Sequence, residues 1–342
     1  MGYGNLFTRA LRVVEAEVGL LSNNRGLLFE PEYFEGKPHP CVVKGNGWLI
    51  QSQTANFSLL PAEFRPPPEL DGYLYILDYP GIEASISVSD RRVVAFGDWT
   101  RLERETSDRR YTLLGNQGLL FRFILTLLER RGIYNFHACA LYDEREHEVI
   151  LALGERGSGK SAFMLSALEK GGFKLLGTEI VHVAFRGGKV AFYKGTLRNN
   201  VRVGHLLYDF PGVMKTIGVR FSGIEDPWGT KVEVSLEPYG FEGDAVLDPS
   251  VTLVIPRIEE DARVCRFSYV ENKRKLRRNL MENLCDKISS LAVIYESIPI
   301  GSLDNADLMR RRLEFVKAFL GRAVRRTVSL FANPRNCLEG WL

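Results

Sequence analysis

The spacing of hydrophobic residues divides the chain into two parts. Near the N-terminus, residues 6–21 carry apolar side chains such as Leu11 and Val18 close to the helical repeat, which predicts an amphipathic helix. The apolar runs that follow are short and separated by proline and glycine, and they predict strands at residues 48–50, 73–77 and 93–96. Residues 1–110 are therefore expected to form a β-rich N-terminal module.

The second part has longer apolar segments. Polar residues 101–110 predict a surface connection, and residues 116–131 predict a helix rich in Leu and Phe. Two apolar runs then predict strands on either side of a charged turn, at residues 136–141 and 149–153. We place the domain boundary near residue 110, so that the second domain covers residues 111–342.

The second of these strands runs directly into a glycine-rich segment. A helix is predicted at residues 161–170, ended by Gly171 and Gly172, and the next strand begins at residues 173–176. The remaining pattern predicts a hairpin, a short strand and two C-terminal helices, at residues 181–193, 251–255, 273–295 and 306–331. This alternation of strands and helices predicts an α/β domain.

Composition narrows the class of protein without naming a function. With 45% apolar and 25% charged residues, the chain is not disordered, collagen-like or a coiled coil, and 342 residues suggest two domains. No stretch approaches the roughly 18 apolar residues of a membrane span, so a cytoplasmic location without membrane contact is expected. The five scattered cysteines lack metal-ligand spacing and are expected to be reduced.

The glycine-rich segment, residues 154–161, reads GERGSGKS and fits the Walker A or P-loop pattern at every fixed position. Glycines let backbone N–H groups point inward around a phosphate at a helix N-terminus, whose dipole also favours negative charge. Lys160 places a cation at the β- and γ-phosphates, and the Ser161 hydroxyl can ligate Mg²⁺. The sequence thus predicts binding of ATP with Mg²⁺, and the expected nucleotide-binding residues are Gly154, Glu155, Arg156, Gly157, Ser158, Gly159, Lys160, Ser161 and Ala162.

Residues outside the P-loop supply candidates for the rest of a phosphotransfer site. Glu179 follows the strand after the P-loop helix and could complete the metal site with Ser161, the alternative being a solvated loop carboxylate. His137 lies in the strand before the loop, where a hydrogen-bonded core histidine is the alternative. Arg198 and Arg257 are candidate phosphate or substrate contacts, the alternative being ordinary surface arginines.

These segments together resemble a known family. The strand FHACA at residues 136–140, the P-loop, the KGGF that ends its helix and the LLGTE at residues 175–179 are similar to the C-terminal catalytic domain of HPr kinase/phosphorylase. Phosphoenolpyruvate carboxykinases share that P-loop fold more distantly. The resemblance covers residues 110–260 and implies an α/β P-loop kinase domain of this type, with a β-rich N-terminal module and C-terminal helices.

The resemblance also assigns roles to individual residues. It implies that His137 lies beside the transferring phosphate, that Lys160 and Ser161 keep the P-loop roles, and that Glu179 takes the second of two consecutive acidic positions. The first acidic position is Thr178 in this chain. Features specific to HPr kinases are also absent directly after the P-loop, so HPr is not the expected substrate.

The departure at Thr178 leaves three alternatives open. In the first, Glu179 takes the roles of both acidic residues. In the second, another group such as His182 or Asp209 contributes, and in the third the protein binds nucleotide without transferring phosphate. The preferred prediction is a Mg-ATP-dependent kinase with Glu179, His137 and Lys160 as catalytic residues. Its acceptor would be a hydroxyl of a small molecule, or of a serine or threonine in a protein or peptide.

Two other functions are retained as alternatives. The first is a nucleotide-binding regulatory protein without transfer activity. The second is an RNA-directed kinase, because the predicted C-terminal helices carry basic runs that would suit a polyanion, although a solvated helix face is the simpler explanation. The runs are Lys273, Arg274, Lys275, Arg277 and Arg278, and then Arg310, Arg311, Arg312, Lys317, Arg322, Arg325 and Arg326. A homo-oligomer is compatible with the sequence, which leaves the acceptor and the choice of ATP over GTP open.

Overall fold

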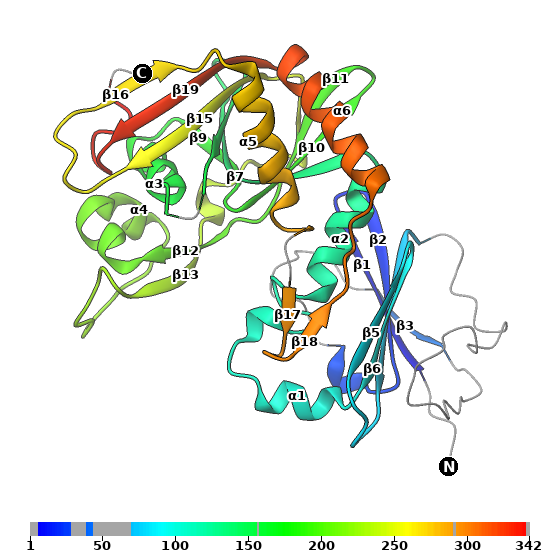
Figure 1. Cartoon of the computed structure of the whole chain (residues 1–342). Helices are drawn as coiled ribbons and strands as arrows, with labels where there is room; N and C mark the ends of the chain where they lie inside the picture. The colour runs from blue at the N-terminus through cyan, green and yellow to red at the C-terminus, as the bar shows by residue number, and fades with distance from the viewer. Residues whose placement is uncertain (1–5, 29–38, 44–69, 156, 290–291, 340–342) are drawn as a thin grey trace. The chain divides into compact units, whose positions relative to one another are not determined.

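The computed structural model describes residues 6–28, 39–43, 70–155, 157–289 and 292–339, and it is a mixed α/β structure with several sheets (Figure 1). The chain divides into two compact units. The first unit comprises Met1–Gly132 and Lys287–Met309, and the second comprises Ile133–Asp286 and Arg310–Leu342. The expected strand at residues 48–50 lies outside the described residues.

The first unit is built on a six-stranded sheet with the order β3-β1-β2-β4-β6-β5. Its strands are β1 (Leu6–Val13), β2 (Ala16–Ser22), β3 (His39–Val43), β4 (Gly72–Asp78), β5 (Ser85–Ser89) and β6 (Arg92–Gly97). The predicted strands at residues 73–77 and 93–96 correspond to β4 and β6. Both are almost fully buried, which explains why they read as unbroken apolar runs.

The helix predicted for residues 6–21 is wrong. These residues form the antiparallel hairpin of β1 and β2, in which Val13 pairs with Ala16 across a two-residue turn. Alternate residues Ala16, Val18 and Leu20 are buried on β2, and Leu21 is buried as well. A strand covered on both sides has apolar residues at spacings that also fit a helix, so the spacing alone did not distinguish them.

Two helices follow β6 in the first unit, and the second of them lies beyond the boundary expected near residue 110. They are α1 (Trp99–Glu105), which occupies part of the predicted surface connection, and α2 (Leu119–Arg130), which lies within the predicted helix at residues 116–131. A Cβ atom added to Gly72 of β4 would lie 2.7 Å from Phe123 of α2. Because α2 packs this closely on the first sheet, the chain passes to the second unit after Gly132.

The first unit is completed by a segment from far along the chain. Strands β17 (Ala292–Ile294) and β18 (Ile298–Ile300) form a small hairpin between Lys287 and Met309. The hydroxyl of Tyr295 donates to Glu103 of α1 and accepts from the Leu113 N–H at 3.0 Å. Burial and the nearby Glu103 carboxylate raise the pKa of the Tyr295 hydroxyl far above its ordinary value.

The second unit is built on a nine-stranded sheet with the order β14-β11-β10-β7-β8-β15-β19-β16, and β9 pairs with β7. Its strands are β7 (Ile133–Asp143), β8 (Glu148–Leu153), β9 (Phe173–Gly177), β10 (Ile180–Arg186), β11 (Lys189–Tyr193), β14 (Ala245–Leu247), β15 (Ser250–Ile258), β16 (Arg266–Tyr269) and β19 (Val324–Ala332). Strands β8, β15 and β19 run parallel to one another. A separate ladder joins β12 (Arg198–Arg202) and β13 (Lys231–Ser235).

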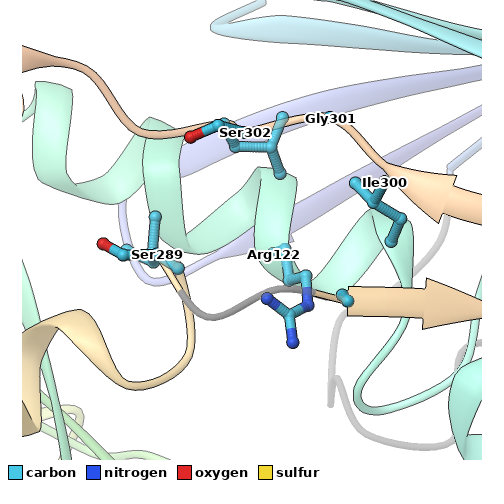
Figure 2. Close-up of a pocket in the computed structure, with 8 residues that line it drawn as sticks. Arg122, Ser289, Ile300, Gly301 and Ser302 are labelled. Carbon is cyan, nitrogen blue, oxygen red and sulfur yellow. The ribbon is translucent and has the colours of Figure 1, made fainter.

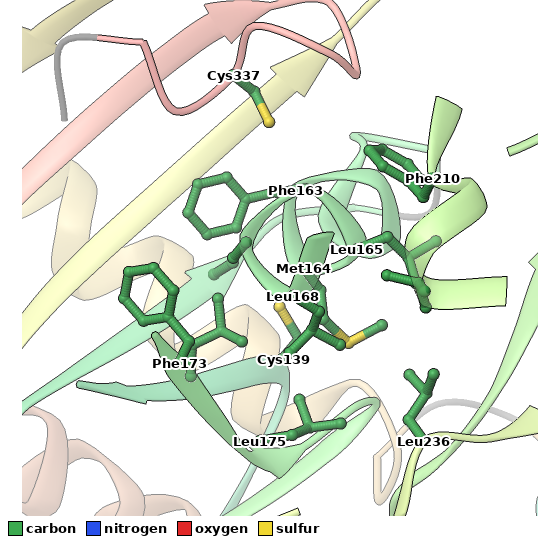
Figure 3. Close-up of a cluster of buried hydrophobic side chains, with 14 of the residues drawn as sticks. Cys139, Phe163, Met164, Leu165, Leu168, Phe173, Leu175, Phe210, Leu236 and Cys337 are labelled. Carbon is green, nitrogen blue, oxygen red and sulfur yellow. The ribbon is translucent and has the colours of Figure 1, made fainter. Parts of the chain in front are cut away.

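Helices cover both faces of this sheet (Figure 1). On one face, α3 (Lys160–Lys170) and α4 (Pro211–Thr216) contribute to a core that includes Cys139 and Phe163 (Figure 3). On the other face, α5 (Lys273–Cys285) and α6 (Ala306–Arg322) contribute Leu280 and Phe319 to a second core. Side chains of the central strands alternate between the two cores, so both faces of these strands are apolar.

The C-terminal region contains more strand than the sequence predicted. The helix expected at residues 273–295 ends at Cys285, and the helix expected at residues 306–331 ends at Arg322. Residues after Arg322 instead form β19, which lies between β15 and β16 and buries Val328 and Leu330. Alternating apolar residues in this segment favour a strand, and tertiary pairing decides the outcome over helical propensity. In the described part of the chain, no helix combines the length and apolar character needed to cross a membrane.

Candidate functional site

The glycine-rich loop, residues 154–161, connects the end of β8 to the start of α3. Gly154, Gly157 and Gly159 have φ angles of 155°, 89° and 96°, which L side chains rarely adopt. A Cβ atom at Gly159 would overlap Ile258 of β15, with Cγ1 only 2.5 Å away. The described glycines of the motif therefore meet conformational requirements that other residues would not. Arg156 lies outside the described residues.

Lys160 folds back over this loop. Its ammonium group donates to the carbonyl oxygen of Gly154 at 2.6 Å and to that of Glu155 at 3.1 Å. The positive charge thus lies at the loop, where Lys160 is also the first residue of α3. The N-terminus of an α-helix favours anions, so the loop combines a fixed dipole with a mobile cation.

Two serines of the loop have different surroundings. The Ser158 hydroxyl oxygen is buried and has no hydrogen-bond partner within the described residues. The Ser161 hydroxyl donates to Asn199 of β12 at 3.4 Å, and Asn199 in turn donates to the Thr178 carbonyl at 3.5 Å. Asn199 was not predicted as a site residue. Asn199 lies on a strand and is only 3% exposed. A buried polar side chain would have made it a candidate site residue, but the sequence does not show burial.

The sheet register brings three predicted site residues to neighbouring strand positions. Ala138 of β7 pairs with Leu153 of β8, and His137 pairs with Ile180 of β10. The first loop residue follows Leu153 on one side of His137, and on the other side Glu179 precedes Ile180 and lies opposite Ala138. The thiol of Cys139, two positions after His137 on β7, contacts the Lys160 carbonyl at 3.7 Å.

His137 has a carboxylate partner that the sequence did not indicate. Its Nδ1 atom lies 2.7 Å from Oδ2 of Asp286, the residue that follows α5. The Asn283 amide also donates to the His137 carbonyl at 2.7 Å. The imidazole is neither fully buried nor fully exposed, with 21% of the side chain accessible. The pairing of residues about 150 positions apart depends on the tertiary fold, and no local motif marks it.

Glu179 lies between β9 and β10 and is half-buried. Its backbone carbonyl accepts a hydrogen bond from the Ala138 N–H at 3.1 Å. Within the described ranges, its carboxylate makes neither a hydrogen bond nor an ion pair. The side chain therefore has unused acceptor capacity beside the strand that carries His137.

Thr178, where the resemblance implies an acidic residue, has a structural role in this protein. The side chain is buried, with 3% of the residue exposed, and its hydroxyl donates to the Thr196 carbonyl at 3.0 Å and also contacts the Arg198 carbonyl. The Thr178 N–H donates to the same Thr196 carbonyl at 2.9 Å. This position is lined by acceptors, so it suits a donor and not a carboxylate.

Replacing Thr178 with Asp should therefore destabilise the protein. The carboxylate would face carbonyl oxygens in a buried position, and we expect the free energy of unfolding to fall by about 3 kcal/mol. Thr178→Ser keeps the hydroxyl and should cost roughly 1 kcal/mol, for the lost methyl group. Urea denaturation of the three proteins measures the difference. A Thr178→Asp protein as stable as the parent, with faster phosphoryl transfer, would contradict this view of the position.

The two predicted arginines are exposed and paired with carboxylates. Arg198 bonds Glu233 at 3.3 Å and is 50% exposed, and Arg257 bonds Glu259 at 2.6 Å and is 75% exposed. The strand predicted to end at Ile255 continues through Pro256 to Ile258, so Arg257 belongs to β15. This extension places Arg257 next to the residue that contacts Gly159. Neither arginine forms its ion pair with a buried carboxylate.

The two other groups considered for catalysis have partners of their own. His182 is buried on β10, with Nδ1 2.7 Å from the Asn135 side chain, and burial lowers its pKa to about 4. Asp209 is bound by His205 at 2.9 Å and by Arg335 at 3.0 Å. His182 is thus a core histidine that stays neutral near pH 7, and Asp209 already has His205 and Arg335 as partners.

The basic runs do not form one continuous surface. Residues Lys273, Arg274, Lys275, Arg277 and Arg278 are exposed on α5, as expected for a solvated or polyanion-binding helix. In the second run, Arg312 is fully buried on α6, and Arg325 and Arg326 belong to β19 and not to a helix. Arg326 is also 3.3 Å from the buried Glu148 carboxylate. Only part of the predicted basic surface is therefore available to a partner.

A cavity of about 150 Å³ lies within the first unit, and it contains none of the predicted site residues. Arg122, Ser289 and Ser302 contribute polar groups to it, and Ile300 contributes apolar surface (Figure 2). The described residues contain no cluster of three or more His, Cys, Asp or Glu side chains that could hold a metal ion by themselves. In comparisons with known proteins, no protein-family model matches the chain, and no curated protein matches it significantly.

Proposed function

We propose that the protein is a Mg-ATP-dependent phosphotransferase that transfers the γ-phosphate to a hydroxyl group. The acceptor is a small molecule, or a serine or threonine of a protein or peptide. The proposal includes a P-loop kinase fold of the HPr kinase and phosphoenolpyruvate carboxykinase type for the second unit. It rests on the chemistry of the glycine-rich loop and its neighbours, and not on a matched relative.

The observation that supports the proposal most strongly is the loop geometry. Gly154, Gly157 and Gly159 have positive φ angles, the Gly159 position leaves no room for a side chain, and Lys160 reaches back to the loop carbonyls. The buried Ser158 hydroxyl has no partner within the described residues, which leaves one polar group of the loop unsatisfied. This donor set fits a polyphosphate at the start of α3.

The residues near the loop have the following roles in the proposed reaction. Lys160 contacts the β- and γ-phosphates, and Ser161 and Glu179 hold the metal. When held by Ser161 and Glu179, Mg²⁺ would supply positive charge to the phosphate oxygens. Glu179 either only holds the metal or also takes the proton of the acceptor hydroxyl, and His137 lies beside the γ-phosphate.

A single experiment tests the central claim. The protein is incubated with γ-labelled ATP and a cell extract, and the labelled product is identified. Transfer of label to one metabolite or polypeptide supports the proposal. Tight ATP binding with no labelled product would favour a regulatory nucleotide-binding protein. The hydrogen bond of the Thr178 hydroxyl to the Thr196 carbonyl supports this alternative, because it gives Thr178 a structural role. Label on RNA, with retention that weakens steeply in salt, would favour the RNA-directed alternative through the exposed α5 cations.

Glu179→Gln should reduce the rate of transfer by about 100-fold or more, because the amide neither ligates Mg²⁺ well nor accepts a proton. ATP hydrolysis and transfer of label measure the effect. Glu146→Gln is the matched control, since Glu146 is an exposed carboxylate in the turn between β7 and β8. If Glu179→Gln keeps the parent's activity, Glu179 has no part in the mechanism.

A further inference from the structure

The carboxylate of Asp286 gives His137 a chemical role that the loop alone does not specify. We propose that Asp286 positions His137 as the general base of phosphoryl transfer, in place of the acidic residue that Thr178 replaces. This inference rests on the proposed function. Its structural basis is the 2.7 Å contact between Asp286 Oδ2 and His137 Nδ1.

The contact determines which imidazole nitrogen can accept a proton. An ionised carboxylate only accepts hydrogen bonds, so at 2.7 Å the Nδ1 atom of His137 must carry the hydrogen. In the neutral imidazole the other nitrogen, Nε2, is then unprotonated and basic. A carboxylate in this position also stabilises the imidazolium that forms when Nε2 takes a proton.

The surrounding structure holds the pair in place. Asn283 and Asp286 are three residues apart at the end of α5 and therefore lie on the same side of the helix. Asn283 donates to the His137 carbonyl at 2.7 Å, while Asp286 binds the His137 ring. Leu280 and Leu284 anchor this end of α5 in the core. The helix thus fixes both the backbone and the ring of His137.

The reaction step balances with ATP and a hydroxyl acceptor. The hydroxyl proton passes to Nε2 of His137 while the hydroxyl oxygen forms a bond to the γ-phosphorus. The bond between the γ-phosphorus and the β–γ bridging oxygen breaks, and its electron pair leaves with ADP. Asp286 does not take the proton, and it acts only through His137. Glu179 is then left to hold the metal, and a second acidic residue beside it is not required.

The tautomer of His137 can be measured without nucleotide. Only five histidines occur in the chain, so imidazole ¹⁵N spectra are simple, and His137→Gln assigns the signal. At about pH 8, where an ordinary imidazole is neutral, we expect the parent protein to show hydrogen on Nδ1 and none on Nε2. In Asp286→Asn the amide donates to Nδ1, and the hydrogen should move to Nε2.

Activity provides the second measurement, with water as the acceptor. Asp286→Asn should lower Mg-ATP hydrolysis by about 100-fold or more and leave the Kd for ATP unchanged. Glu282→Gln removes one negative charge from the same helix, where Glu282 pairs with Arg278 on the surface, and it should change neither the tautomer nor the rate. Asp286 is half-exposed, so the variant should fold, and its thermal unfolding verifies this.

The outcomes separate this inference from the proposed function. A parent protein that neither binds nor hydrolyses ATP overturns the proposed function, and the inference with it. A parent that hydrolyses ATP with hydrogen on Nε2 of His137, or on both nitrogens, overturns the inference alone, and so does full activity of Asp286→Asn. Hydrogen on Nδ1 together with a slow Asp286→Asn and an unchanged Glu282→Gln supports it.

Discussion

Replacing Lys160 with Ala is expected to lower the rate of phosphoryl transfer by about 100- to 1,000-fold, which is the usual loss when one group that stabilises transition-state charge is removed. ATP binding should also weaken by about tenfold or more, because a charge-assisted contact to phosphate is lost. The structure places the positive charge of Lys160 directly at the loop. Lys160 is the first residue of α3, and its ammonium group donates to the Gly154 carbonyl at 2.6 Å.

Isothermal titration with ATP and an assay with labelled ATP measure the two effects. Lys170→Ala is the matched control, because Lys170 is the exposed last residue of the same helix and carries the same charge. We expect it to retain both affinity and rate. Unchanged ATP binding in Lys160→Ala would show that the loop is not a phosphate site, and the central claim would then be wrong.

Replacing Gly159 with Ala should abolish measurable ATP binding and also destabilise the second unit. The new methyl group would overlap the branched side chain of Ile258, which has little rotamer freedom. The φ angle of 96° adds strain of about 1–2 kcal/mol for an L residue, and overpacking adds roughly another 1–3 kcal/mol. Relief of the overlap would move the loop or β15, and either change would displace the loop N–H groups that are proposed to contact a phosphate.

A second glycine separates the two causes. Gly172 has a φ angle of 90°, but a Cβ atom there would meet nothing within 4 Å. Gly172→Ala should therefore show the backbone strain alone, with ATP affinity unchanged. Urea denaturation and ATP titration of both variants make the comparison. Equal losses of stability and affinity in the two variants would mean that the contact with Ile258 has no role.

The sequence could predict the part of the site that depends on local pattern. A glycine-rich motif between an apolar run and a helix has few structural solutions, so the loop, β8 and α3 were found within one or two residues. The alternation of glycines and apolar residues also located the hairpin of β10 and β11. In these segments, local propensity and tertiary structure favour the same outcome.

The contacts that complete the site depend on residues far apart in the chain. Asn199 reaches Ser161 across 38 positions, and Asp286 reaches His137 across 149. Neither partner belongs to a motif, and α5 was expected to continue well beyond Asp286. The same limitation affected β19, which pairs with β15, and the hairpin of β1 and β2. Pairing between distant strands depends on which residues are buried in the folded chain. The spacing of apolar residues along the sequence does not give this information.

The division of the chain has a consequence for how the protein is made. The first unit needs Tyr295 to join Glu103 and Leu113, and the second unit needs β19 between β15 and β16. Residues 287–309 must therefore leave the second unit and return to it before either unit is complete. During synthesis from the N-terminus, the first unit is completed only after some 150 further residues have followed Gly132. Until that segment is made, the nascent chain exposes apolar side chains of the first unit that the finished fold covers.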